Sequence, residues 1–81
     1  MTLSGVLLAC RPEFIPQVTR SVNDLGWAEV HFTEDTGRMV LTIEADDVRQ
    51  SVDRLTHIKG LPRVISAEMA ETRVIDHEDQ P

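Results

Sequence analysis

Hydrophobic and polar residues alternate along three stretches of the chain. Residues 27–34, WAEVHFTE, residues 38–45, RMVLTIEA, and residues 63–71, RVISAEMAE, each place apolar side chains at every second position. A period of two is typical of a strand that buries one face. The sequence therefore predicts three half-buried strands, with Phe32 on the buried face of the first and Ile65 on the buried face of the last.

The rest of the chain holds one more strand and two helices. Residues 4–10, SGVLLAC, form an apolar run of strand length without a clear polar face. Residues 15–25 and 46–59 instead repeat apolar positions every three or four residues, as amphipathic helices do. Asp46 is the expected N-cap of the second helix. Its expected buried stripe comprises Val48, Val52, Leu55 and Ile58.

The order strand, helix, strand, strand, helix, strand is that of a ferredoxin-like βαββαβ sandwich, an α+β fold. Right-handed crossovers predict a four-stranded antiparallel sheet in the order 4-1-3-2, with two helices on one face. The length of 81 residues predicts one domain, which we place at residues 1–72. Residues 73–81 are expected to form an acidic, mobile tail. The second face of the sheet then has no helix layer.

A short turn at residues 35–38 predicts a hairpin between the second and third strands, because its glycine can adopt a positive φ. If Thr36-Gly37 is a two-residue loop, Phe32 lies opposite Leu41 and Glu29 lies opposite Glu44. Like charges directly across an antiparallel pair destabilise it by a few tenths to about 1 kcal/mol. A cationic partner would relieve this repulsion, and carboxylates that splay into water are the alternative.

Charge and cysteine content narrow the choice of partner and compartment. Fourteen acidic and eight basic residues give a formal net charge of −6, which disfavours binding to nucleic acid. The single cysteine, Cys10, cannot form an intramolecular disulfide, so we expect a cytoplasmic protein. No apolar stretch approaches the roughly 20 residues of a membrane span, so no stable membrane insertion is expected.

The residue types that carry out catalysis do not occur in the required patterns. The glycines are scattered singly, so no phosphate-binding loop is present. His31, His57 and His77 lack the close Cys or His partners of a zinc site. Cys10 has no histidine near it in the sequence, and no serine lies in a nucleophile motif. We expect no enzymatic activity, no metal and no cofactor.

The uncovered face of the sheet is the expected binding surface. A shallow apolar strip runs between acidic and polar side chains, and an arginine from a partner would suit the carboxylates. A face-to-face homodimer would bury the same strip. The residues expected to bind are Leu7, Ala9, Trp27, Glu29, His31, Val40, Thr42, Glu44, Val64, Ser66, Glu68 and Ala70.

Three stretches resemble the NapD family: SGVLLACRPEFIPQV, AEVHFTEDTGRMVLTIEADD and IKGLPRVISAEMA. The likeness covers nearly all of residues 4–72. It implies a ferredoxin-like cytoplasmic chaperone that binds the twin-arginine signal peptide of the catalytic subunit of periplasmic nitrate reductase. Such a chaperone holds back export until the molybdenum cofactor is inserted. Glu29, Glu44 and Glu68 would then take the arginines, and the apolar strip would take the apolar segment.

Two other functions fit the same order of elements. A ligand-sensing regulatory module like the ACT domains shares this order and an Arg-Pro turn after the first strand, and it would bind a small molecule at a subunit interface. A purely structural oligomerisation domain is the third option. The sequence also leaves open a weak homodimer.

Overall fold

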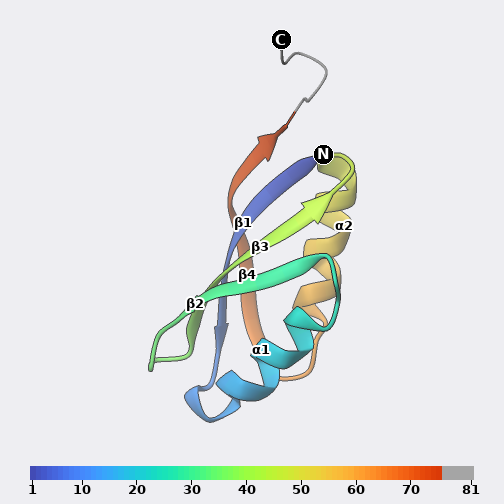
Figure 1. Ribbon diagram of the computed structural model, residues 1–81. Coiled ribbons are helices and arrows are strands. Elements are labelled where there is room, and N and C mark those ends of the chain that lie inside the picture. The colour runs from blue at the N-terminus through green and yellow to red at the C-terminus, as the bar shows by residue number, and fades with distance from the viewer. Residues whose placement is uncertain (76–81) are drawn as a thin grey trace.

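A computed structural model describes residues 1–75 and contains a four-stranded antiparallel sheet with two α-helices on one side (Figure 1). The strand order β2-β3-β1-β4 confirms the predicted order 4-1-3-2, counted from the opposite edge. The elements are β1 (Thr2–Cys10), the 3-10 helix η1 (Pro12–Phe14), α1 (Ile15–Asn23), β2 (Ala28–Thr33), β3 (Arg38–Ala45), α2 (Val48–Lys59) and β4 (Val64–Val74). Residues 76–81, most of the expected tail, lie outside the described residues.

A proline in the first turn marks the start of α1, and an aspartate N-cap marks the start of α2. Pro16 lies in the first turn of α1, where the backbone needs no internal donor. The side chain of Asp47 accepts a hydrogen bond from the Gln50 backbone at 2.8 Å, so Asp47 is the N-cap of α2. The predicted N-cap, Asp46, lies one residue earlier and donates its backbone N–H to the Gln50 side chain at 2.7 Å. These reciprocal bonds hold the start of α2.

The hydrophobic core lies between the sheet and the helices. Alternate residues of the central strands supply one side, and apolar residues of the helices supply the other. The buried cluster comprises Val6, Leu8, Cys10, Val18, Val22, Met39, Leu41, Ile43, Leu55, Ile58 and Ala67.

The buried stripe of α2 is turned from its predicted position. Val48 and Val52 are half exposed, while Ser51 is fully buried beside Leu55 and Ile58. The Ser51 hydroxyl donates to the Asp47 carbonyl at 3.1 Å, so this polar side chain is buried without an unmet hydrogen bond. The predicted stripe is therefore confirmed at Leu55 and Ile58 and wrong at Val48 and Val52.

The β2–β3 hairpin has a longer loop than predicted. The Glu34 N–H donates to the Arg38 carbonyl at 2.8 Å, and the Gly37 N–H donates to the Glu34 carbonyl at 2.9 Å. These bonds close a three-residue loop in which Gly37 has φ 97°. Such loops, with glycine in the left-handed region, are a common hairpin type. The extra residue shifts the pairing of the two strands by one position.

A bulge at His31 shifts the register a second time. Between the loop and the bulge, Phe32 lies opposite Val40 and thus on the uncovered face, so its predicted core position is wrong. Beyond the bulge, Glu29 lies opposite Thr42, so the predicted direct pairing of Glu29 with Glu44 is also wrong. A one-residue shift moves a side chain to the other face of a strand, and a second shift moves it back.

Strand β4 also begins in a register that alternation did not predict. Val64 pairs with Cys10 and packs against the core, although it was expected on the uncovered face. Ile65, expected in the core, lies at the register shift and is 68% exposed. Further along, Ala70 lies at a second shift, because Met69 pairs with Val6 and Glu71 pairs with Gly5. The strand then continues to Val74.

The buried thiol of Cys10 provides a test of the core. Burial raises the pKa of this thiol, so its thiolate is disfavoured in the folded protein. We expect the disulfide reagent DTNB at pH 8 to label the folded protein at least about tenfold more slowly than the unfolded protein. Because the folded pKa is the higher one, the stability contributed by the protonated thiol is lost as the pH rises through that value. Equal labelling rates would contradict the burial.

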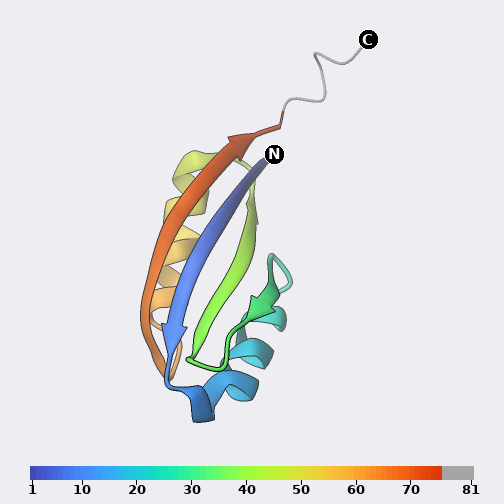
Figure 2. The same ribbon diagram turned by 90° about the vertical axis from the view of Figure 1, so that its left-hand side faces the viewer.

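Figure 2 shows the opposite side of the sheet, with all four strands in front and both helices behind them. Among the described residues, no helix covers this face. The uncovered face that the sequence predicts is therefore present, and the bulges decide which side chains it carries.

Candidate functional site

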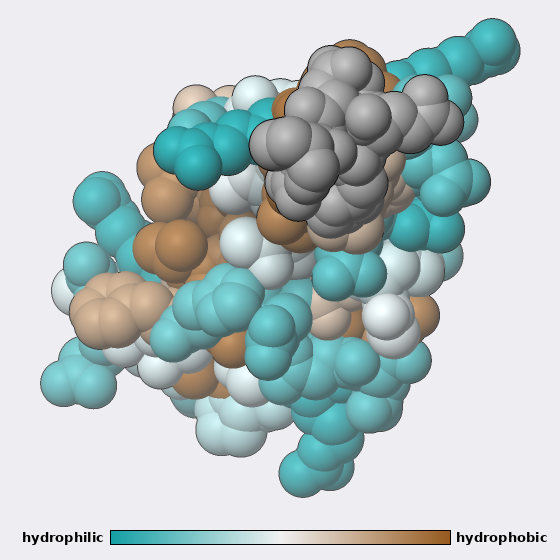
Figure 3. All heavy atoms as spheres, turned by 45° about the horizontal axis from the view of Figure 1, so that its top comes forward, coloured by the Kyte–Doolittle hydropathy of each residue, from teal (hydrophilic) through white to brown (hydrophobic). Residues whose placement is uncertain are grey.

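An apolar pocket of about 390 Å³ opens on the uncovered face, at the end of the sheet where the hairpin loop joins β2 and β3. Its exposed apolar side chains are Leu7 at 52%, Phe32 at 55% and Val40 at 39% exposure. Its full lining is Leu7, Leu8, Ala9, Phe32, Glu34, Arg38, Met39, Val40, Ser66 and Glu68. Figure 3 shows apolar side chains gathered between polar ones on the left-hand side of the molecule, where this face lies.

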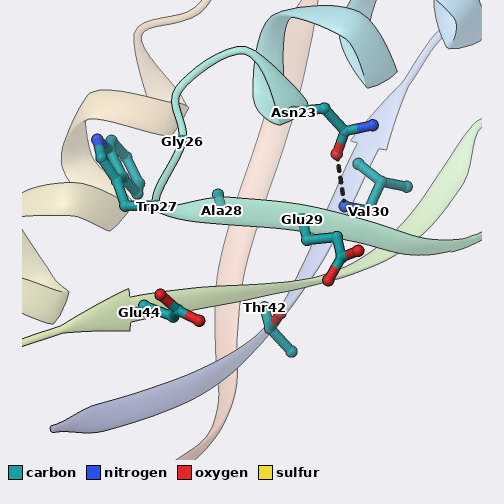
Figure 4. Close-up of a pocket in the computed structure, with 8 residues that line it drawn as sticks. All are labelled: Asn23, Gly26, Trp27, Ala28, Glu29, Val30, Thr42 and Glu44. Carbon is teal, nitrogen blue, oxygen red and sulfur yellow. Dashed lines mark hydrogen bonds between the residues drawn. The ribbon is translucent and has the colours of Figure 1, made fainter.

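A second, more polar pocket of about 360 Å³ lies beside β2 and β3, away from the hairpin loop (Figure 4). Its lining is Asn23, Gly26, Trp27, Ala28, Glu29, Val30, Thr42 and Glu44. Glu29 extends from β2 and Glu44 from β3, in diagonal positions of the antiparallel pair. We call this the acidic pocket, because its two ionisable side chains are both carboxylates.

Local hydrogen bonds position the polar groups of the acidic pocket. His31 Nε2 lies 2.8 Å from Thr42 Oγ1 and 3.7 Å from Glu29 Oε2. Arg54 donates to the backbone carbonyl of Glu44 and not to its carboxylate. Within residues 1–75, neither carboxylate of this pocket forms an ion pair with a lysine or arginine. Both remain available to a cation from outside.

Trp27 lies against the helix layer. Its ring packs against the guanidinium of Arg54, 5.0 Å from the ring centroid, and makes an edge contact with His57 at 5.8 Å. The Asn23 side chain accepts a hydrogen bond from the Val30 backbone at 2.9 Å, which ties α1 to β2 (Figure 4). Trp27 therefore supports the wall of the acidic pocket from the side of α2, directly before the edge strand β2.

The expected binding residues divide into two groups. The apolar pocket contains Leu7, Ala9, Val40, Ser66 and Glu68. The acidic pocket and its polar neighbours contain Trp27, Glu29, His31, Thr42 and Glu44. Val64 belongs to the core, and Ala70 is exposed at its bulge. The three glutamates thus do not form one cluster, because Glu68 lies across β1 beside Leu7.

Sequence reasoning missed five lining residues of the apolar pocket: the exposed Phe32, Glu34 and Arg38, and the buried Leu8 and Met39. Phe32 was assigned to the core by the alternation of its strand. Glu34 was expected at the end of its strand and Arg38 in the turn, and a backbone hydrogen bond joins the two residues across the hairpin loop. Only the length of the hairpin loop would have revealed the three exposed positions.

Neither a metal-binding cluster nor a membrane-spanning helix is found in the described part of the chain. No three His, Cys, Asp or Glu side chains among residues 1–75 come together as a metal site. No helix in this part is long and apolar enough to cross a membrane.

Comparisons with known proteins identify the family. The sequence matches the NapD protein family over residues 1–74. No curated protein matches significantly. The solution structure of the E. coli Tat proofreading chaperone protein NapD is similar, with a TM-score of 0.80, 15% sequence identity, and coverage of 98% of this chain and 85% of that chain. That likeness shows the shared fold, and the family match over nearly the whole sequence shows that this chain belongs to the NapD family.

Proposed function

We propose that this chain is a cytoplasmic chaperone that binds the twin-arginine signal peptide of the catalytic subunit of a periplasmic nitrate reductase. By holding the peptide, it delays export until the cofactor has been inserted into that subunit. The chain itself catalyses no reaction and holds no cofactor. Membership of the NapD family supports this proposal, as does the similar fold of a protein described as a Tat proofreading chaperone.

The observation that carries the proposal is the uncovered face with its apolar and acidic pockets. A signal peptide of this class presents arginines followed by an apolar segment, so it needs carboxylates next to an apolar surface. Contiguous exposed apolar side chains on a small monomer commonly mark a binding surface. Guanidinium groups bind carboxylates by charge-assisted hydrogen bonds. The face offers both chemistries.

The carboxylate half of the proposal is tested by the double variant Glu29→Gln, Glu44→Gln. Exposed charge pairs contribute up to about 1 kcal/mol each, so we expect the client signal peptide to bind about five- to tenfold more weakly at low salt. The salt dependence of binding should also decrease, because fewer charges are paired. Calorimetric titration measures both effects. The melting temperature should stay the same or rise slightly, since two neighbouring like charges are removed.

A matched control removes two carboxylates from the helix side. Asp24→Asn with Asp53→Asn changes the net charge equally at exposed positions outside both pockets. This control should bind the peptide as the parent protein does. If both double variants bind equally well, the carboxylates of the acidic pocket have no role in recognition.

A further inference from the structure

The two pockets are separated along the strands of the uncovered face. Val40 of the apolar pocket and Glu44 of the acidic pocket are four residues apart on β3, which corresponds to about 13 Å at the usual rise of a strand. This distance spans about nine residues of an α-helix. A bound peptide that uses both pockets must therefore lie along the strands.

We propose that the signal peptide lies parallel to β1, with its arginines at Glu29 and Glu44 and its apolar segment over Leu7 and Phe32, and that it crosses the sheet over Gly5. This inference rests on the proposed function and adds the direction and path of the bound peptide.

Charge sets the direction. The apolar pocket contains Arg38 as well as Glu34 and Glu68, so a guanidinium placed there would meet a positive charge. Arg38 is absent from the lining of the acidic pocket, where the ionisable side chains are carboxylates. The arginines of a signal peptide precede its apolar segment. The peptide therefore runs from the acidic pocket toward the hairpin loop, antiparallel to β3.

Gly5 provides the path between the pockets. It lies in the middle of β1, next to Thr42 of β3 and Glu71 of β4. Its φ is not positive, and an added Cβ would meet only the Glu71 carbonyl oxygen at 4.0 Å. The conformation and packing of this residue would therefore accept a side chain, and Gly5 lies beside the register shift between β1 and β4. A glycine within a strand often marks the close approach of another backbone. Because Gly5 has no side chain, the bound peptide can approach the backbone of β1 where it crosses this strand.

Paramagnetic broadening of amide signals tests the direction. The client signal peptide carries a nitroxide either before its arginines or after its apolar segment, and the full chain is labelled with ¹⁵N. The first label should broaden the amides of Leu3 and Glu44, and the second should broaden those of Ala9 and Phe32. The reverse pattern would overturn the direction but leave the proposed function intact. Broadening confined to α2, or no binding, would overturn both.

The substitution Gly5→Val tests the path. A branched side chain at this position should weaken peptide binding at least about tenfold, because it raises the surface under the bound backbone. Folding should be unharmed, since the Cβ has room and valine favours strands. The control Thr33→Val places a valine in a strand on the other face of the sheet, opposite Met39, and should bind normally. Normal binding by Gly5→Val would overturn the path over Gly5.

Discussion

Replacing Gly37 by alanine should lower the free energy of unfolding by about 3 kcal/mol. Gly37 has φ 97°, a conformation that costs other residues about 1–2 kcal/mol. An added Cβ would also lie 1.9 Å from the Cys10 carbonyl oxygen. To relieve this clash, the hairpin loop must move away from the end of β1. The movement breaks the 2.9 Å hydrogen bond from the Cys10 N–H to the Gly37 carbonyl, a further loss of about 1 kcal/mol.

Gly26 provides the control for this prediction. It also has a positive φ, 81°, but an added Cβ would meet no atom within 4 Å. Gly26→Ala should therefore lower the free energy of unfolding only by the strain of the positive φ, about 1–2 kcal/mol. Urea denaturation of both variants measures the difference, and for a domain of this size each kcal/mol lowers the melting temperature by about 4–8 °C. Equal losses would contradict the close contact between Gly37 and β1.

The second large effect concerns binding. Leu7→Asn combined with Phe32→Ser should weaken binding of the signal peptide by roughly 100-fold. Both side chains are about half exposed in the free protein, at 52% and 55%. Completing the burial of two such side chains contributes roughly 3 kcal/mol in total, which equals about two orders of magnitude in Kd. Stability should fall by less than it does for a core substitution, because about half of each side chain is already in contact with solvent.

The helix layer supplies a matched control of the same exposure. Val48 and Val52 on α2 are 48% and 50% exposed, on the side of the molecule away from the uncovered face. Val48→Gln with Val52→Gln should leave the Kd unchanged in the same titration. If this control weakens binding as much as the double variant of the apolar pocket, the peptide does not dock on the sheet.

The order of elements and the topology of the sheet could be predicted because they follow from hydrophobic periods that extend over whole elements. The alternation in β3 correctly separated Leu41 and Ile43 in the core from Val40 and Glu44 on the uncovered face. Both faces of β1 are apolar, and the neighbouring strands decide how it is oriented. Fold class depends on these long patterns, so errors of one residue did not affect it.

The candidate site was predicted less well, because a shift of one residue in strand pairing changes which side chains lie on the uncovered face. One additional residue in the hairpin loop moved Phe32 from the core to the uncovered face, and a register shift near Cys10 exchanged the positions of Val64 and Ile65. Alternation assumes that strands pair without interruption, so it cannot show a bulge. The apolar pocket consequently gained an aromatic side chain that the sequence pattern had placed in the core.

Strand β4 runs for eleven residues along one edge of the sheet, and within residues 1–75 its outer side pairs with no other strand. A long flat edge of this kind invites other chains to add on strand by strand. The two bulges of β4 interrupt its regular spacing, and charged Glu68, Glu71 and Arg73 lie along it. One face of the sheet can therefore stay apolar and exposed while the edge of the sheet remains a poor template for the growth of fibrils.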